Sequence, residues 1–440
     1  MNIGMIGLGY VGLVTAVGFG EMKHRVNCYD IDKNKIDMLM RREAPIYEDS
    51  LQDKLNDREI YESIRLLDNM DDLVKSSQVI FIAVGTPSQQ SGEANTDYVK
   101  SAVSEIVNAL INLGEAGNRV VVIKSTVPVG LTKEMQNLAN EMLRSHPKIK
   151  VELGFCPEFL REGTAVGDFL NPERIVIGAE TDDAYNKIRE VFEPFFERGV
   201  PEIKTNPVTA EIIKYAANIM LASKISLLNE IADYADLVGG KIEDVSRAVG
   251  LDSRIGAKFL SASLGFGGSC FPKDVKAFSY FTSKDGLDLP IAQSIMRSNE
   301  MHIERQVDKI RVIARDNGCK KIGFLGTAFK ANTDDVRESP AIKLVASLVN
   351  SGFKACVTDP QALQNTKKIL GDSVEYANTI DEASTGADML VICTEWSEYK
   401  SIDLDMLRGQ MNKKIIIDLR NILKRDAVET AGFLYFGIAN

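Results

Sequence analysis

The chain has 440 residues, which at about 100–200 residues per domain is enough for two or three domains. Its 45% hydrophobic and 26% charged residues are ordinary for a globular protein, and its net charge of -10 argues against general binding to polyanionic nucleic acid. Because no apolar run reaches the ~20 residues of a membrane helix and no signal peptide precedes the first strand, we expect a cytoplasmic protein.

The first third of the chain alternates short apolar runs with helical patterns, which predicts βαβ units and a mostly parallel sheet. We assign residues 1–205 to this domain. The predicted strands are Ile3–Ile6, Val26–Tyr29, Val79–Val84, Val120–Ile123, Val151–Phe155 and Ile175–Ile177.

The segment after the first strand, Gly7-Leu8-Gly9-Tyr10-Val11-Gly12, has the spacing of a dinucleotide-binding turn. Its glycines permit a tight turn, close approach of a pyrophosphate and close packing of helix on strand, while N–H groups at the helix start attract phosphate. Asp30 ends the next strand, where a carboxylate bonds the ribose 2′-hydroxyl and repels a 2′-phosphate. NAD is therefore the expected cofactor, although Lys33 and Lys35 nearby slightly weaken the preference over NADP.

Two later strands end in Gly85-Thr86-Pro87 and Ser125-Thr126-Val127-Pro128. Since ligands of open parallel sheets bind at the carboxyl ends of strands, Thr86 and Thr126 are candidates for contact with the cofactor. Plain strand-exit turns are the alternative, because proline and small polar residues commonly terminate strands.

Two segments in the middle of the chain carry polar residues at spacings that catalysis can use. Glu158 and Glu162 point to the same side whether their segment is helical or extended, and one of them could act as a general base. Lys214 and Asn218 lie four apart on a predicted helix and could together stabilise an oxyanion. Exposed polar surface is the alternative for both pairs.

The region from 206 to 316 is predicted to be a central helical domain. Thr209–Val238 contains no proline or glycine, and at 1.5 Å per residue it would form a helix ~45 Å long. Such a helix suits a domain connector or a dimer interface. Helical patterning continues to about Asp316.

Six cysteines are present, and Cys270 has the setting that suggests reactivity. It follows the glycine-rich segment Gly265–Ser269, whose backbone can approach a ligand closely, and the neighbouring Lys273 favours a thiolate, while Asp274 could hold a lysine or a water. A buried, inert cysteine in a glycine turn is the alternative. No CxxC pair is present, so we expect no metal site. Three other cysteines lie in apolar strand-like runs and are expected in the core: Cys28, Cys356 and Cys393. The three histidines, His24, His146 and His302, have no partner pattern and are expected to be structural or solvated.

A second alternating region predicts a smaller α/β domain over residues 317–440. Its predicted strands are Lys321–Leu325, Lys354–Thr358, Met389–Thr394 and Ile415–Leu419, with a helix at Ala341–Asn350. The predicted fold class is therefore α/β, with two Rossmann-like parallel-sheet domains joined by a helical middle region that contains one long connecting helix.

Eight segments in this order resemble the UDP-glucose 6-dehydrogenase family of nucleotide-sugar dehydrogenases, over essentially the whole chain. They are GLGYVG, VGTP, KSTVPVG, PEFLREGTA, EIIKYAANI, DSRIGAKFL, GFGGSCFPKD and FKANTDDVRES. The resemblance implies a four-electron oxidation of UDP-glucose to UDP-glucuronate with two NAD. It also implies that Cys270 captures the intermediate aldehyde and forms a thioester that water hydrolyses.

The resemblance also assigns roles to individual residues. Lys214 and Asn218 would stabilise charge on oxygen, Glu158 would act as the base for thioester hydrolysis, and Thr126 and Asp274 would hold the catalytic water. The residues implied for NAD binding, beyond the glycine-rich turn, are Asp30, Lys35, Thr86, Thr126, Glu162, Lys273 and Arg337. Those implied for substrate binding are Glu158, Phe159, Leu160, Arg161, Glu162, Lys214, Asn218, Arg254, Phe259, Ser263, Phe266, Gly267, Lys330 and Arg420.

The resemblance makes the central domain a dimerisation domain and the C-terminal domain the half that binds UDP. Arg254 would reach the active site of the partner in a homodimer. Two positions depart from the family pattern: Cys156 stands where asparagine is expected, and Leu419 where glycine is usual. The first bears on the positioning of Glu158 and the second on the assignment of Arg420.

Three other functions remain open. A dehydrogenase for GDP-mannose or UDP-N-acetylmannosamine is the main rival, although Gly267–Phe271 and the DSRIG segment look more like UDP-glucose enzymes. A two-electron hydroxyacid dehydrogenase would have no use for Cys270 or for a second sheet domain. A non-catalytic NAD-binding sensor would bind both ligands without turnover.

Overall fold

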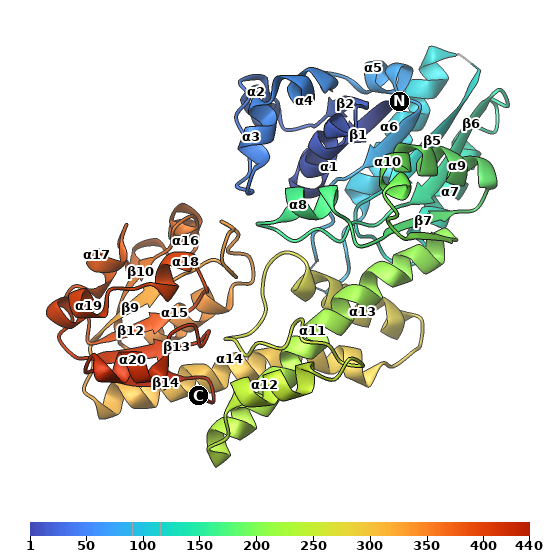
Figure 1. Ribbon diagram of the computed structural model, residues 1–440. Coiled ribbons are helices and arrows are strands. Elements are labelled where there is room, and N and C mark those ends of the chain that lie inside the picture. Colours follow the sequence, from blue (N-terminus) through green and yellow to red (C-terminus); the bar gives the residue numbers. More distant parts are fainter. Residues whose placement is uncertain (90, 115) are drawn as a thin grey trace. The chain divides into compact units, whose positions relative to one another are not determined.

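The computed structural model describes residues 1–89, 91–114 and 116–440, and it divides into two compact units. Unit 1 is Met1–Ala217 and unit 2 is Asn218–Asn440 (Figure 1). The division falls inside one helix, α11 (Pro207–Val238), which matches the long helix predicted from Thr209. The predicted domain limits at residues 205 and 316 stay predictions.

Unit 1 contains, in the residues described, an eight-stranded sheet in the order β3-β2-β1-β4-β5-β6-β7-β8. Every neighbouring pair is parallel except β6 and β7. The six predicted strands are all present, whereas β3 and β8 were missed because each is short and partly exposed. The bounds are β1 (Asn2–Ile6), β2 (Arg25–Tyr29), β3 (Ile64–Leu66), β4 (Val79–Ile82), β5 (Gly117–Ile123), β6 (Ile149–Phe155), β7 (Ile175–Ala179) and β8 (Glu202–Thr205).

Helices cover both faces of this sheet because successive strand residues point to opposite sides. In β4, Val79 and Phe81 join a core with α1, α3, α4, α8, α9 and α10, while Ile80 and Ile82 join a core with α5, α6 and α7. The helices of unit 1 before α11 are α1 (Tyr10–Glu21), α2 (Lys33–Met40), α3 (Leu51–Asn56), α4 (Arg58–Ser63), α5 (Met70–Ser76), α6 (Asp97–Leu113), α7 (Leu131–Met142), α8 (Ala165–Leu170), α9 (Asp182–Val191) and α10 (Glu193–Glu197).

Unit 2 begins with helices and ends with a sheet. After the larger part of α11 come α12 (Ile242–Gly250), α13 (Phe271–Lys284) and α14 (Pro290–Asp316). Residues 251–270 form no helix, which breaks the continuous helical pattern expected up to Asp316. Glycines at 256, 265, 267 and 268 explain the break, since glycine is unfavourable in helices.

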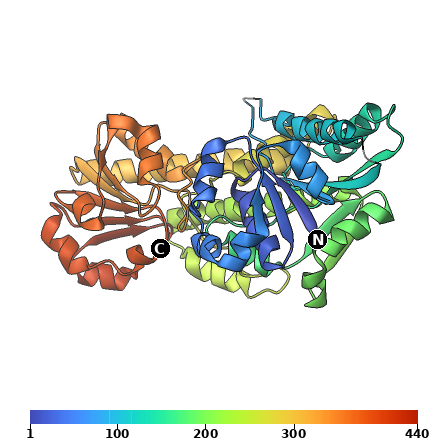
Figure 2. The same ribbon diagram turned by 90° about the horizontal axis from the view of Figure 1, so that it is seen from above.

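The described part of unit 2 has one fully parallel sheet, in the order β11-β10-β9-β12-β13-β14. Figure 2 draws this part of the chain in orange and red. Its strands are β9 (Lys321–Leu325), β10 (Lys354–Thr358), β11 (Glu375–Tyr376), β12 (Met389–Ile392), β13 (Ile415–Asp418) and β14 (Leu434–Gly437). One core joins the sheet to α14, α15 and α16, and a second joins it to α17, α18, α19 and α20. These helices are α15 (Pro340–Asn350), α16 (Leu363–Leu370), α17 (Ile380–Ser384), α18 (Ser397–Lys400), α19 (Leu404–Gln410) and α20 (Arg425–Thr430).

A mostly parallel sheet, a fully parallel sheet and a helical middle region that contains the long helix α11 confirm the predicted fold class. The strands β11 and β14 were not predicted. The first has only two residues, too few for a pattern, whereas the second lies in the apolar run from Phe433 to Ala439 and could have been predicted from it.

Candidate active site

The glycine-rich turn of unit 1 joins β1 directly to the start of α1. Gly9 is the N-cap of that helix, no side chain caps it, and a Cβ at Gly9 would meet no atom within 4 Å. At Gly12, by contrast, a Cβ would lie 1.8 Å from Gly7 O, so the helix can pack against the turn only because this residue is glycine. Uncapped N–H groups beside open space fit the pyrophosphate of a dinucleotide.

Asp30 follows β2 at the same edge of the sheet, and its side chain is 7% exposed. Its two carboxylate oxygens accept the N–H groups of Leu8 at 2.6 Å and Asp32 at 2.8 Å. Lys35 Nζ lies 3.7 Å from the same carboxylate. Each oxygen keeps a second lone pair, which fits a ribose hydroxyl as a further donor.

The loops after β4 and β5 are tied together by two hydroxyl groups. Thr86 Oγ1 donates to Thr126 O at 2.8 Å, and Ser125 Oγ donates to Val84 O at 2.6 Å. Thr86 is buried and Thr126 half-buried. The structure therefore gives both threonines a role in holding the loops, which is compatible with either reading of these strand ends.

Glu158 and Lys214 form a buried ion pair within unit 1, with side chains 7% and 5% exposed. The ammonium donates to Glu158 Oε1 at 2.9 Å and to Glu158 O at 2.8 Å, while Glu158 Oε2 accepts Leu160 N–H at 2.6 Å. Burial works to raise the pKa of the Glu158 carboxyl, but the charge and hydrogen bonds of Lys214 and Leu160 outweigh it and hold that pKa below its ordinary value.

The segment that follows Glu158 has no helix or strand until α8. Glu162 is half-buried, and Arg161 is exposed and bonds to Asp168 at 2.6 Å. Phe159 is half-buried with the Arg174 guanidinium 3.8 Å above its ring centroid.

Glu48 anchors this segment and was not predicted. Its buried carboxylate accepts Gly163 N–H at 2.7 Å and Ala165 N–H at 2.6 Å. Gly163 N–H also approaches the Tyr10 hydroxyl at 2.7 Å, which links the segment to the start of α1. These contacts span 115 or more positions of sequence, so no local pattern could reveal them.

Cys270 lies at the N-cap of α13 in unit 2, and it is the one cysteine of the six that is not buried. Its Sγ is 3.5 Å from Ser269 Oγ. The N–H groups at a helix start carry partial positive charge, which favours an anion there. The expectation of buried core thiols at Cys28, Cys356 and Cys393 is confirmed.

Asp274, one turn into α13, is 1% exposed and gathers two donors. It accepts Lys273 Nζ at 2.5 Å and Asn218 Nδ2 at 2.6 Å, and its own N–H bonds to Cys270 O at 2.8 Å. The predicted residues Cys270, Asp274, Lys273 and Asn218 therefore form one cluster in unit 2. Lys214 precedes Asn218 by four residues in the same helix.

The predicted loop residues of unit 2 pack around the cysteine segment. Ser263 and Phe266 are buried, and Phe259 and Phe266 lie 6.4 and 6.0 Å from the Phe271 ring. A Cβ at Gly267 would lie 2.4 Å from Glu338 O, so the VRES segment lies directly against this loop.

The predicted cationic residues of unit 2 differ in exposure. Arg254 is 87% exposed and pairs with its neighbour Asp252 at 2.6 Å. Arg337 is also exposed and pairs with Asp335 at 2.7 Å, whereas Arg420 is half-buried and pairs with Glu395 at 2.9 Å. Lys330 is half-buried, with Nζ 5.6 Å from the Phe329 ring centroid.

The two departures from the family pattern are both core residues. Leu419 is 1% exposed and Cys156 is 2% exposed. The Leu419 side chain packs into the core of the second sheet, and the next residue, Arg420, is half-buried beside Glu395. Cys156 fills the core beside α8, so it does not displace Glu158 from its ion pair.

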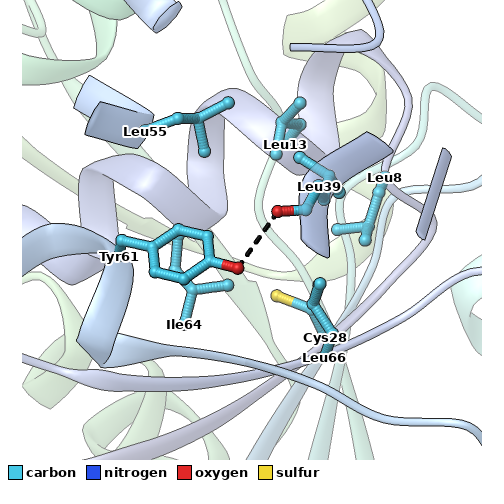
Figure 3. Close-up of a pocket in the computed structure, with 8 residues that line it drawn as sticks. All are labelled: Leu8, Leu13, Cys28, Leu39, Leu55, Tyr61, Ile64 and Leu66. Carbon is cyan, nitrogen blue, oxygen red and sulfur yellow. Dashed lines mark hydrogen bonds between the residues drawn. The ribbon is translucent and has the colours of Figure 1, made fainter. Parts of the chain in front are cut away.

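A small apolar cavity lies in unit 1 beside the first strands (Figure 3). Its volume is about 250 Å³ with its open mouth included, below the ~300–1,000 Å³ of ordinary ligand sites. The Tyr61 hydroxyl donates to Leu39 O at 3.1 Å. No lining residue carries a charge for phosphate, so the cavity is not the dinucleotide site. It is lined by Leu8, Leu13, Cys28, Leu39, Leu55, Tyr61, Ile64 and Leu66.

Through residues 1–89, 91–114 and 116–440, no helix combines the length and apolar character that crossing a bilayer requires. The same ranges contain no group of three or more histidine, cysteine or acidic side chains arranged for a metal ion.

Three family models together match most of the chain. They are the NAD binding domain of the UDP-glucose/GDP-mannose dehydrogenase family over residues 1–196, its central domain over 208–301 and its UDP binding domain over 323–425. A UDP-glucose 6-dehydrogenase of Rhizobium meliloti is 40% identical over 100% of this chain and 99% of its own length.

Two solved structures are similar over the full length of the chain. A UDP-glucose dehydrogenase from Pyrobaculum islandicum has 35% identity and a TM-score of 0.88, with 100% of this chain and 97% of the other covered. A UDP-D-ManNAc dehydrogenase from Pyrococcus horikoshii has 27% identity and a TM-score of 0.85, with coverage of 100% and 99%.

The buried ion pair predicts a pH-dependent loss of stability in Glu158→Gln. Because the folded-state pKa of Glu158 is depressed, its stabilising effect is present above the ordinary glutamate pKa of about 4.3 and is lost as pH falls through the lowered value. We expect the free energy of unfolding of the variant to be about 3 kcal/mol lower than that of wild type at pH 7, and the difference to shrink in acid.

Urea unfolding measured at pH 7 and at several acidic pH values checks this difference. Glu59→Gln, which removes an exposed pair with Lys23, is the matched control and should change stability little. A deficit in Glu158→Gln that stays constant with pH would contradict the ion-pair account.

Proposed function

The chain belongs to the UDP-glucose/GDP-mannose dehydrogenase family, and we propose that it oxidises UDP-glucose to UDP-glucuronate with two molecules of NAD. The observation that carries the proposal is Cys270, half-buried at the start of α13 and one turn before Asp274, whose carboxylate accepts the Asn218 amide. A two-electron dehydrogenase needs no such thiol. UDP-glucose is preferred over N-acetylmannosamine because the UDP-glucose enzymes are more similar in sequence to this chain.

NAD supplies a hydride acceptor for each of the two oxidations. The first converts the C6 alcohol to an aldehyde and releases a proton. The Cys270 thiolate then adds to the aldehyde carbon, and the alkoxide of the resulting thiohemiacetal loses a hydride to become a thioester. Water attacks the thioester, the C–S bond breaks, and a carboxylate, the thiolate and two protons are released. One alcohol, one water and two NAD thus yield one carboxylate, two NADH and three protons.

The charged residues supply proton and charge control around these steps. The Lys214 ammonium and the Asn218 amide are donors for oxygen that becomes negative during oxidation and thioester formation. Glu158 is proposed to accept a proton from attacking water; the Lys214 charge that lowers the pKa of this carboxyl keeps it ionised but weakens it as a base. Asp274 and Thr126 are proposed to orient that water.

The remaining binding roles follow the family resemblance. The uncapped start of α1 and the Asp30 carboxylate support NAD binding in unit 1. Lys330 and Arg420 are proposed to neutralise the diphosphate of the substrate. Lys35, Thr86, Glu162, Lys273 and Arg337 keep their proposed contacts with NAD. Phe159, Leu160, Arg161, Phe259, Ser263, Phe266 and Gly267 keep theirs with the nucleotide sugar.

Replacement of the nucleophile separates covalent capture from cofactor binding. We expect Cys270→Ala to form no UDP-glucuronate while it binds NAD as tightly as wild type, because the NAD-binding residues of unit 1 are unchanged. The measurements are product by chromatography, NAD affinity by calorimetry and the ratio of NADH to product. Wild type should give two NADH per uronate, and a ratio of one, or steady uronate formation by Cys270→Ala, would contradict the mechanism.

Removal of the Asp30 carboxylate should reduce the selectivity for NAD. The side chain both accepts the ribose hydroxyl and repels a 2′-phosphate, so Asp30→Ala loses both effects. We expect the ratio of kcat/KM for NAD to that for NADP to fall by at least about 10-fold, the equivalent of about 1.4 kcal/mol. An unchanged ratio would mean that this acid does not touch the ribose.

A homodimer is proposed from the exposed face of α11 in unit 2. Five large apolar side chains follow one another at intervals of seven, four, three and four residues, which places them on one stripe of the helix. Such a contiguous exposed stripe is typical of a protein interface. The residues are Met220, Leu227, Ile231, Tyr234 and Val238. Arg254, which is exposed and paired with Asp252, is proposed to serve the partner's site.

Mixed dimers test whether Arg254 acts in the neighbouring subunit. Arg254→Ala and Cys270→Ala should each be inactive alone, but a dimer with one subunit of each retains one site with both residues intact. Co-expression with two different affinity tags and tandem purification isolates that dimer. We expect about half of the wild-type activity. No recovery would show that Arg254 acts within its own subunit, and an active Arg254→Ala homodimer would show that this arginine is not needed.

A further inference from the structure

The loop that leads to Cys270 has no regular structure of its own. Residues 261–270 contain no helix or strand, and Gly265 and Gly268 have φ angles of +133° and +81°. Glycine loses more conformational entropy than any other residue when its backbone is fixed in one conformation. A nucleophile at the end of this loop needs contacts from elsewhere to hold it in place.

Three buried side chains of α11 and α14 provide such contacts by holding both backbone groups of two loop residues. Ser263 donates its N–H to Asn229 Oδ1 at 3.0 Å, and its carbonyl lies 2.8 Å from His302 Nε2. Phe266 donates its N–H to Asn299 Oδ1 at 2.9 Å and accepts Asn299 Nδ2 at 3.0 Å. The exposed fractions of Asn229, Asn299 and His302 are 0%, 3% and 0%.

The partners of His302 define the form of its ring. Nδ1 lies 2.8 Å from Asp233 Oδ1, and the second Asp233 oxygen accepts Arg305 at 2.7 Å. Although burial works to raise the pKa of Asp233, His302 and Arg305 lower it below its ordinary value, so the carboxylate is ionised. A carboxylate and a carbonyl only accept hydrogen bonds, so a ring that donates to both of them carries hydrogen on both nitrogens, as an imidazolium does.

We propose that His302, as an imidazolium paired with Asp233, acts with Asn229 and Asn299 as a set of positioning residues that hold the Cys270 loop in its reactive conformation. The proposal rests on the proposed function for the role of Cys270 as nucleophile. None of the four residues was a candidate from the sequence, where His302 was expected to be structural or solvated. The other groups of α14 that face Asp233 are Arg305 and Gln306, the latter with Nε2 at 3.3 Å.

The form of the ring can be tested directly in the wild-type protein. The chain has three histidines, so nitrogen NMR of ¹⁵N-histidine protein gives few signals, and His302→Gln assigns the missing one. We expect both nitrogens of His302 to carry hydrogen at pH 7. His24 is the internal reference, since burial lowers its pKa and keeps it neutral. A signal of unprotonated nitrogen from His302 would overturn the imidazolium.

The positioning role is tested by His302→Gln with Glu230→Ala as its matched control. Glu230 also joins α11 to α14, by a bond of 2.7 Å from Ser298, but it is exposed and its bond is to α14 rather than to the loop. Because small misplacements of a reacting group cost about 100-fold, we expect kcat with UDP-glucose to fall about 10- to 100-fold in His302→Gln, with unchanged NAD affinity. Glu230→Ala should retain wild-type kcat.

The rate at which iodoacetamide alkylates Cys270 provides a readout that does not depend on oxidation of the nucleotide sugar. Since Cys270 is the one cysteine that is not buried, a single thiol reacts in the folded protein. We expect this rate to change at least about 5-fold in His302→Gln and not in Glu230→Ala, in line with the dependence of thiol reactivity on its surroundings.

Unchanged kcat and alkylation in His302→Gln would overturn the positioning role. If UDP-glucose proves not to be the substrate, the alkylation and NMR results still test whether His302 positions the Cys270 loop. The two proposals can therefore fail separately. Should His302→Gln not fold, Asn299→Ser, which shortens the side chain that holds Phe266, takes its place in the same measurements with the same expected and contrary results.

Discussion

The positions of the candidate catalytic groups in unit 1 depend on the buried ion pair between Lys214 and Glu158. Two charges removed from water need close partners, and here the ammonium binds both the carboxylate and the carbonyl of one residue. One turn earlier on α11, the buried Glu211 carboxylate accepts the N–H groups of Gly130 and Thr132 at the start of α7. The first turns of α11 are thus fixed to the loops after β5 and β6. These contacts also fix the positions of the candidate catalytic groups Lys214 and Glu158.

The turns after the first strand of the two sheets are held by the same kind of hydrogen bond, but the helices that follow them are capped differently. Asp30 accepts Leu8 N–H at 2.6 Å, and Asp359 accepts Thr327 N–H at 2.7 Å, each from the end of the second strand to the turn after the first. The helices that follow diverge, because α1 has no side-chain cap whereas Ser339 caps α15. Only the first of these two turns leaves helix N–H groups for a dinucleotide, which agrees with the separate NAD and UDP binding domains of the family.

The strands and the dinucleotide turn could be predicted from the sequence because both depend on local pattern: apolar runs between turns, and glycines at fixed spacing before a helix. The contacts that hold the site could not. Glu48 reaches Gly163 across 115 positions, and His302 reaches Ser263 across 39, so only the folded chain brings them together. The ion pair at Glu158 lay between these cases, since its residues were singled out from spacing and resemblance but not paired with each other.

The position of Cys270 also determines which thiol of the protein is oxidised first. Five of its six thiols are buried, and burial raises the pKa of each of them, so peroxide finds little thiolate there. Cys270 combines access with a helix start that favours the anion, the combination under which sulfur oxidises first. Oxidative damage to this chain therefore begins at the residue assigned to catalysis, and a preparation can lose its activity while its fold and its other thiols remain intact.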